Sequence, residues 1–304
     1  MADRGLRFSE QLVDRLMEFK LTRGNIGWIG LELIILLCIL GALIDLAFSP
    51  KDWNYFSPIL MLVDLILTPF GTSLGGIDYK FPIIFRALAN GVITTIYISV
   101  VSLICGFIVA AIFAVILVSK GSVFGLKYVV QSYVDFFRST PLLVQILLVY
   151  FALPALIPGI TSVFRQYEIV AGIIGLTLNT SAYQTEIIRS GILAIPIGQT
   201  EASRALGMTQ RQTMRYVIVP QAIRLIVPPL TNESIQLILN SSLLSVIGVT
   251  ELTKVTRSLQ STYFYWQVYL IAAIFYFVLA FSLAKVSARV EVRLRIPGLG
   301  VANE

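Results

Sequence analysis

The chain has 304 residues, of which 57% are hydrophobic and 13% are charged, and its formal net charge is +6. Soluble domains contain about 45–50% apolar and about 25% charged residues, so this composition indicates a membrane protein. The excess of Lys and Arg does not indicate nucleic-acid binding, because these residues collect on the cytoplasmic side of membrane proteins. Histidine is absent, which excludes a hydrolase of the usual Ser-His or Cys-His type. Cys38 and Cys105 lie in separate apolar runs and predict neither a disulfide nor a metal site.

Six apolar runs are long enough to cross a bilayer, which takes roughly 20 apolar residues in a helix. They cover residues 28–48, 91–118, 129–156, 168–188, 220–249 and 264–286. The sequence therefore predicts an all-α integral membrane protein with about six transmembrane helices. Pro228 and Pro229 interrupt the fifth run, which predicts either a kinked helix or a partly re-entrant one.

The segments outside the spans have distinct compositions. Residues 6–21 place apolar side chains on one helical face, which favours a helix on the inner leaflet or, alternatively, contact with a partner subunit. The predicted organisation is a cytoplasmic amphipathic tail at 1–24, an additional transmembrane helix at 25–49, an extracytoplasmic segment at 50–86, a helical core at 87–290 and a cytoplasmic tail at 291–304. Lys and Arg concentrate in both tails and in the loops after the second and fourth spans, so we predict that both termini are cytoplasmic.

The loop between the fourth and fifth spans, residues 197–220, has a regular pattern. Gly207 suits the left-handed position after a helix end, which predicts two short helices joined at this glycine. Thr209, followed three residues later by Gln212, predicts a capping box that opens the second helix. Pro220 then starts the next membrane segment. From the residues alone, an amphipathic loop that rests on the membrane remains an alternative.

The same loop resembles the EAA loop of permease subunits in bacterial ATP-binding-cassette (ABC) importers. That family's pattern is Glu-Ala-Ala, three residues, Gly, nine residues and Ile-x-Leu-Pro. This chain has Glu201-Ala202-Ser203, Gly207 and Val217-Ile218-Val219-Pro220 at the same spacing, with mild replacements at 203, 217 and 219. In the family this loop docks into a cleft of the ATPase subunit. The resemblance implies that six residues couple the chain to an ATPase: Glu201, Ala202, Ser203, Arg204, Leu206 and Gly207.

Two further segments resemble the polar amino-acid uptake branch, whose members carry histidine, glutamine, glutamate or arginine. Residues 138–145 are Arg-Ser-Thr-Pro-Leu-Leu-Val-Gln, and residues 182–191 are Ala-Tyr-Gln-Thr-Glu-Ile-Ile-Arg-Ser-Gly. The resemblance covers roughly residues 91–252 and implies the five-helix core of a type I importer plus one extra N-terminal helix. The chain departs from the branch at Leu239, where relatives usually have Lys. If that Lys contacts substrate in relatives, its role is absent or displaced here.

Polar residues inside spans are costly and are therefore candidates for function. Asn232 and Glu233 lie about 20 Å of helix rise after Pro220, which places them near the middle of the bilayer. The candidate solute pathway consists of Gln145, Asn179, Tyr183, Asn232, Glu233, Gln236 and Asn240. The alternative for these residues is hydrogen bonding between helices. A structural role is predicted for Arg138, Pro141, Glu186, Arg189, Pro220, Pro228 and Pro229.

The chain contains no phosphate-loop sequence, so we expect no ATP site, cofactor, metal or catalytic residue of its own. The resemblance implies ATPase subunits that bind ATP and Mg, a second permease subunit, identical or not, and an extracytoplasmic amino-acid-binding protein. The chain is also expected to contact the transported polar amino acid and membrane lipid, and it is not expected to bind nucleic acid. The predicted function is a transport subunit of an ABC importer in the cytoplasmic membrane that works by alternating access. The alternative is a secondary transporter or channel for small polar solutes. Such a protein often has several acidic residues near the middle of the membrane, and here only Glu233 is clearly placed there.

Overall fold

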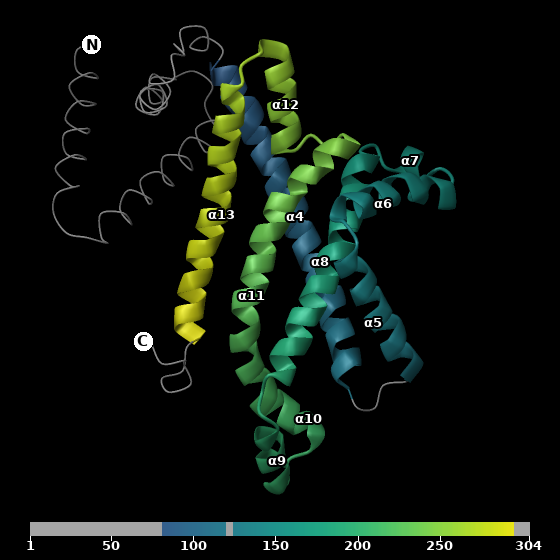
Figure 1. The fold of residues 1–304 in the computed structure, drawn as a ribbon, viewed down its shortest axis with the longest axis vertical. Coiled ribbons are helices and arrows are strands. Elements are labelled where there is room, and N and C mark those ends of the chain that lie inside the picture. Colours follow the sequence, from purple (N-terminus) through teal and green to yellow (C-terminus); the bar gives the residue numbers. More distant parts are fainter. Residues whose placement is uncertain (1–80, 120–123, 295–304) are drawn as a thin grey trace, which may run out of the picture. The chain divides into compact units, whose positions relative to one another are not determined.

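A computed structural model describes residues 81–119 and 124–294 (Figure 1). These residues form helices and turns and contain no strand. The elements are α4 Phe81–Val118, α5 Phe124–Ser139, α6 Leu142–Leu156, α7 Ile160–Val163, α8 Tyr167–Leu193, α9 Ile197–Ala205, α10 Gln210–Thr213, the π-helix η4 Met214–Ile218, α11 Val219–Asn240, the 3-10 helix η5 Ser241–Ile247, α12 Leu252–Tyr263 and α13 Gln267–Leu294. The predicted N-terminal tail, first span and most of the extracytoplasmic segment lie outside the described residues. The chain divides into two units after Ala89, and the packing described below lies within the second unit.

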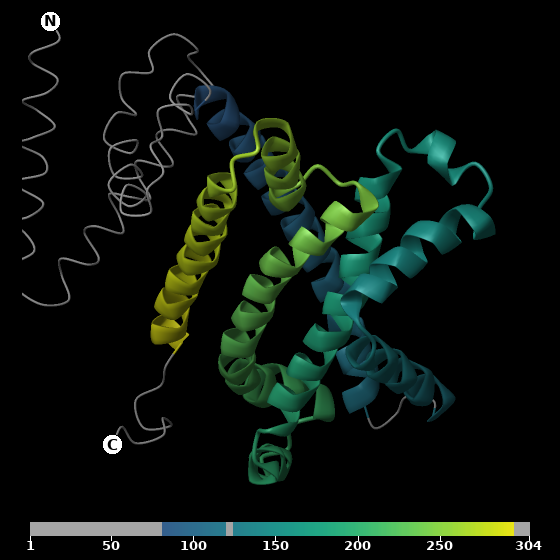
Figure 2. The same ribbon diagram turned by 45° about the horizontal axis from the view of Figure 1, so that its top comes forward.

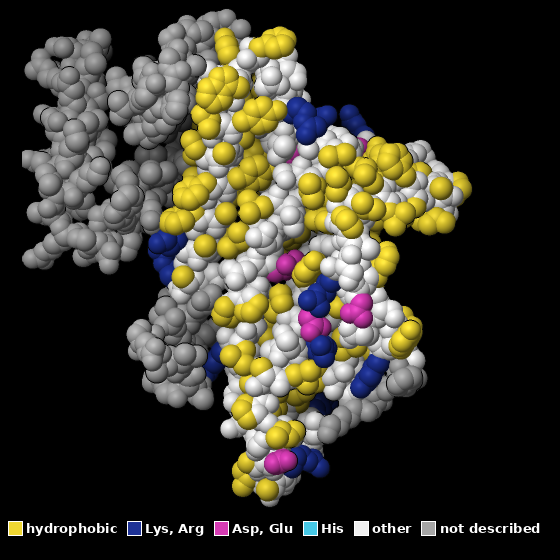
Figure 3. All heavy atoms as spheres, in the orientation of Figure 1, with side chains coloured by type: hydrophobic (Ala, Val, Ile, Leu, Met, Phe, Trp, Pro, Cys, Tyr) yellow, Lys and Arg dark blue, Asp and Glu magenta, His cyan; other side chains and the backbone are white. Residues whose placement is uncertain are grey.

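Two of the described helices are long and apolar enough to cross a membrane alone, at residues 83–118 and 267–290. Two bent pairs meet the same test together, namely α5 with α6 and residues 210–247 with α12, so the described residues hold up to four such spans. Large apolar side chains remain exposed along α4, for example Ile104, Ile112 and Val115, as expected for helices that face lipid. Figure 3 shows hydrophobic side chains gathered over α13 and over α6 and α7.

α8 covers the predicted fourth span with 27 residues, but it is a more polar helix. It packs against α5, α6 and α11, so protein rather than lipid surrounds much of its surface. Its buried residues include Asn179, Thr180, Ser181, Gln184 and Thr185. A helix enclosed by other helices can hold such side chains, because its neighbours supply their hydrogen-bond partners.

The predicted third span, 129–156, is two helices rather than one. α5 ends at Ser139, α6 begins at Leu142, and the two axes differ by 112° (Figure 2). The cause is Pro141, whose backbone is extended with φ −64° and ψ 131°. A proline disfavours the helical conformation of the residue before it, here Thr140, so the helix ends although the apolar sequence continues.

In the predicted fifth span, by contrast, the helix is not interrupted at its prolines. α11 continues from Val219 to Asn240 with Pro228 and Pro229 inside it, so it is a continuous helix, and Figure 2 shows it as curved. Neither proline has an N–H group, so neither can donate to the carbonyl groups of Arg224 and Leu225 one turn earlier. The sharper change of direction comes after η5, where Gly248 takes φ +95° and a 51° bend leads into α12.

The apolar core of the second unit lies where α4, α6, α8, α11 and η5 meet. Its buried members are Ile98, Ile146, Leu176, Leu237, Leu244, Ile247 and Val249. Gly175 lets α8 approach α6 closely, because a Cβ atom there would lie 3.3 Å from the Ile146 Cα. Small residues at helix crossings are the usual means of close packing in membrane proteins.

Candidate coupling loop and solute pathway

The predicted loop at 197–220 forms a separate projection at one end of α8 and α11, at the opposite end from α12 (Figure 1). α9 ends at Ala205, and Gly207 takes φ +82°, the left-handed conformation that its position predicted. The Gln212 N–H donates to Thr209 Oγ1 at 3.3 Å, and the Thr209 N–H donates to Gln212 Oε1 at 2.8 Å. Both halves of the predicted capping box are therefore present, and α10 opens on it.

Ser203, which stands where the family pattern has Ala, faces into the loop. Its side chain is 4% exposed and donates 2.9 Å to the Thr200 carbonyl and 3.0 Å to Thr213 Oγ1. Thr213 is also buried and belongs to α10, so this hydroxyl pair ties α9 to α10. The Ser203 side chain is thus placed to brace the loop, and it is not available on the loop's outer surface.

The outer surface of the loop is formed by the other predicted coupling residues. Glu201 and Ala202 are exposed, and Leu206 is 84% exposed directly before the glycine. Arg204 does not pair with Glu201; its Nη1 donates 2.7 Å to the Met208 carbonyl and closes the turn. Ile197 and Tyr216, which the sequence analysis did not single out, are 68% and 62% exposed on the same projection. The loop therefore combines a braced interior with apolar side chains on its outside.

Gln145 and Asn179, two of the predicted pathway residues, meet at the break between α5 and α6. Gln145 is 3% exposed, and its Nε2 lies within 3.0 Å of the Phe137 carbonyl, the Thr140 carbonyl and Thr140 Oγ1. Its Oε1 accepts from Asn179 Nδ2 at 2.9 Å. The amide of Gln145 replaces the helical donors that the bend removes. This geometry favours the hydrogen-bonding alternative for both residues.

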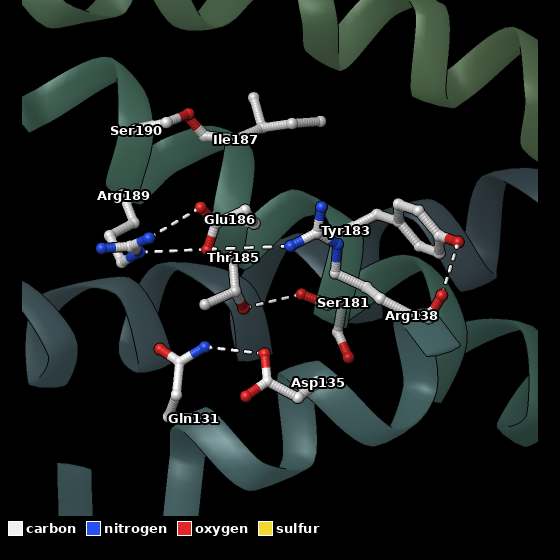
Figure 4. A network of polar contacts seen from close by, with 10 residues as sticks. All are labelled: Gln131, Asp135, Arg138, Ser181, Tyr183, Thr185, Glu186, Ile187, Arg189 and Ser190. Carbon is white, nitrogen blue, oxygen red and sulfur yellow. Dashed lines mark hydrogen bonds and ion pairs between the residues drawn. The ribbon is translucent and has the colours of Figure 1, made fainter. Parts of the chain in front are cut away.

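Tyr183 lies in a polar network between α5 and α8 (Figure 4). Arg189 contacts Glu186 through two nitrogens, Nε at 3.0 Å and Nη2 at 2.8 Å, and Arg138 approaches the same carboxylate at 3.9 Å. The Arg138 guanidinium also lies 5.6 Å from the centre of the Tyr183 ring, whose hydroxyl donates 3.4 Å to the Arg138 carbonyl. Glu186 and Arg189 therefore form an ion pair, which agrees with the structural role predicted for both residues. Arg138 joins this pair at 3.9 Å, a contact that the sequence did not indicate, and Tyr183 packs against Arg138.

The remaining pathway residues lie on α11. Asn232 and Gln236 are exposed one turn apart, and Asn240 is half-buried one further turn along. Glu233 is half-buried, and its Oε1 accepts a 2.8 Å hydrogen bond from Thr180 Oγ1 on α8. The structure thus brings Asn232, Glu233 and Gln236 to one stretch of α11, apart from the Gln145–Asn179 pair.

Comparison with known proteins identifies the family. The model of the binding-protein-dependent transport system inner membrane component family matches residues 103–296, more than half of the chain. The chain belongs to this family. It is therefore a permease subunit of an ABC importer, and it is not of the ATPase-subunit type.

Three relatives of the permease illustrate the match. The L-cystine transport system permease protein TcyB of Bacillus subtilis is 37% identical over 209 residues, which are 68% of this chain and 86% of that protein. The arginine transport system permease protein ArtQ of Bacillus subtilis is 35% identical over 211 residues, 68% of this chain and 92% of that protein. The third is a chain in the crystal structure of an amino acid ABC transporter with histidines. Its sequence is 37% identical to this one, the two folds superpose with a TM-score of 0.64, and the match covers 73% of this chain and 99% of that chain.

The permease also contains a buried acid that the sequence analysis missed. Glu251 is fully buried at the start of α12, where it accepts hydrogen bonds of 2.8 Å from the backbone N–H groups of Thr253 and Lys254. The Tyr276 hydroxyl on α13 donates a third bond at 2.9 Å, and the neighbouring Leu252 N–H donates 3.2 Å to Thr95 Oγ1 on α4. Glu251 therefore helps to join α12 to α13 at the end of the molecule opposite the coupling loop.

Proposed function

We propose that this permease translocates polar amino acids across the cytoplasmic membrane by alternating access, driven by a separate ATPase that binds the loop at 197–220. Two permease subunits, identical or related, would stand on two ATPase subunits that hold ATP and Mg, and an extracytoplasmic binding protein would deliver the solute. The substrate class is supported by relatives named for L-cystine and arginine.

One observation carries the proposed coupling. The loop connects α8 directly to α11, and these two helices carry Thr180 and Glu233, which are hydrogen-bonded to each other. A displacement of the loop would therefore move α8 and α11 together, and with them Thr180 and Glu233. The capping box and the Ser203–Thr213 hydrogen bond stiffen the loop. A movement of the ATPase at Leu206 would therefore displace α8 and α11 and would not merely deform the loop.

The docking surface that we propose is the outer side of this loop. Leu206, Ile197 and Tyr216 are exposed apolar side chains, and apolar anchors of this kind usually carry most of the binding energy at a protein interface. Glu201 and Ala202 lie on the exposed side of α9, where Ala202 leaves room for a partner's surface to approach closely. Ser203 contributes from inside by keeping α9 in place.

The proposed solute site is the polar stretch of α11. A zwitterionic amino acid needs acceptors for its ammonium group and donors for its carboxylate. Glu233 supplies a carboxylate oxygen, and the exposed amides of Asn232 and Gln236 supply both donors and acceptors. Asn240 extends the same face towards η5.

The proposal is tested by reconstituting the permease with its ATPase and binding protein in liposomes and measuring ATP hydrolysis with each of the twenty amino acids. Stimulation by one or a few polar amino acids is expected. Stable assembly without any response to amino acids would contradict the substrate class. Failure to assemble with the ATPase would contradict the coupling role of the loop.

A further inference from the structure

Glu233 is held by a single hydrogen bond that comes from one side. Thr180 Oγ1 donates to Oε1 at 2.8 Å, and no other described residue donates to this carboxylate. Thr180 itself is 1% exposed, so no water competes for its hydroxyl from the α8 side. The second oxygen, Oε2, accepts no hydrogen bond from the part of the chain that the structure describes. The carboxylate is therefore fixed at one oxygen and open at the other.

The direction of this hydrogen bond is set by Gln184. Gln184 lies one turn after Thr180 on α8, is 1% exposed, and points its Nε2 at Thr180 Oγ1 from 3.4 Å. Because the amide occupies a lone pair of the hydroxyl oxygen, the hydroxyl hydrogen is directed to its other neighbour, Glu233 Oε1. Gln184, Thr180 and Glu233 thus form a directed chain from α8 to α11.

The rotamer of Thr180 is set by Gly106 on α4. A Cβ atom at Gly106 would lie 2.5 Å from the Thr180 Cγ2, so only glycine leaves room for this methyl group. With the methyl group seated against α4, the hydroxyl must point towards α11. Threonine has few accessible χ1 rotamers because its Cβ is branched, and packing against Gly106 selects one of them.

We infer that Thr180 is a positioning residue for transport, which fixes Oε1 of Glu233 so that Oε2 is presented to the ammonium group of the transported amino acid. Gln184 and Gly106 act through Thr180, the first by orienting its hydroxyl and the second by selecting its rotamer. This inference rests on the proposed function, because it takes Glu233 as part of the solute site.

The test compares isosteric variants by equilibrium binding. The purified permease–ATPase complex, without binding protein, is titrated with each of the twenty amino acids in radiolabelled form. Thr180→Val keeps the shape of the side chain and removes the hydroxyl, and it is expected to raise Kd roughly tenfold, the value of one hydrogen bond to a charged group. Thr180→Ser keeps the hydroxyl and should retain most of the affinity. Gly106→Ala should resemble Thr180→Val, since the added methyl group displaces the Thr180 side chain.

Thr177→Val is the matched control. Thr177 lies one turn before Thr180 on the same helix, and its buried hydroxyl has no hydrogen-bond partner among the described residues, so its removal should leave Kd unchanged. In a Glu233→Gln background, Thr180→Val should add little to the loss already present.

The outcomes separate the two claims. If Glu233→Gln binds every amino acid as the wild type does, the proposed solute site is wrong. If Glu233→Gln raises Kd while Thr180→Val and Thr177→Val behave alike, Glu233 remains in the site and the positioning role of Thr180 is overturned. If Thr180→Val raises Kd equally with and without Glu233→Gln, Thr180 acts independently of Glu233, and the inference is also overturned.

Discussion

At the scale of single residues, a substitution at Glu233 should reduce transport without affecting assembly with the ATPase. Replacing it with Ala removes the carboxylate from the polar stretch of α11 and leaves the coupling loop intact. We expect uptake into proteoliposomes to fall by about tenfold or more, the scale of a lost charge-assisted interaction. Copurification with the ATPase should stay normal. Uptake equal to that of the wild type would show that Glu233 serves packing only.

Gly191 offers a test of the contact between α8 and α11. A Cβ atom at this position would overlap Ile226 Cγ1, so Gly191→Ala requires the Ile226 side chain or the two helices to shift. Overpacking of this kind costs about 1–3 kcal/mol, and we expect a lower thermal unfolding temperature of the assembled complex. Ile226→Ala removes the opposing atom, and the double variant should recover part of the lost stability. A double variant less stable than either single variant would contradict this contact.

Residues with local partners were the ones that the sequence could predict. The capping box of Thr209 and Gln212 and the conformation of Gly207 depend on neighbours within three residues, and both are confirmed. Gln145 and Glu251 were harder, because their partners Asn179 and Tyr276 lie 34 and 25 residues away. The composition of a span does not tell which of its polar groups face each other.

At the scale of elements, the coupling loop should behave as one rigid unit with an apolar outer side. Leu206→Asp places a charge where we propose that the ATPase packs, so copurification with the ATPase should be lost. Leu206→Met keeps an apolar side chain and serves as the control. Binding of the Asp variant as strong as that of the wild type would exclude Leu206 from the interface.

The internal brace of the loop has its own test. Thr213→Val removes one of the two acceptors of the Ser203 hydroxyl and leaves the Thr200 carbonyl as the other, so it costs about 0.5–1.5 kcal/mol, the value of one hydrogen bond. Since the outer surface is unchanged, the ATPase should still bind. We expect fewer amino acids to be imported per ATP hydrolysed, because a softer loop transmits less of the movement. An unchanged ratio would show that the brace has no part in coupling.

The two spans that contain prolines take different courses for different physical reasons. At Pro141 the chain leaves the helix because the proline disfavours a helical conformation at Thr140, and Gln145 then donates replacement hydrogen bonds to the carbonyls of Phe137 and Thr140. At Pro228 and Pro229 the chain stays helical, because α8 and α13 pack along α11. A proline can therefore end a helix or leave it continuous and curved. Which of the two occurs depends on the contacts that neighbouring elements supply.

At the scale of the whole molecule, the spacing of the loop residues was enough to predict the family, which the comparisons confirm. The loop could be predicted because its pattern is short and continuous in sequence. The identity of the transported amino acid is not encoded in such a pattern, since a solute site is assembled from several helices. The sequence did not indicate how the loop is connected to the proposed solute site. The structure provides this connection through the hydrogen bond between Thr180 on α8 and Glu233 on α11.

The most direct test of the whole account is the energy source of uptake. The permease, its ATPase and its binding protein are placed in liposomes without any ion gradient, and accumulation of a radiolabelled polar amino acid is measured with and without ATP inside. We predict accumulation that requires ATP and stops when Leu206→Asp replaces the wild type. Uptake that needs no ATPase and follows an imposed ion gradient would contradict the account and identify a secondary transporter.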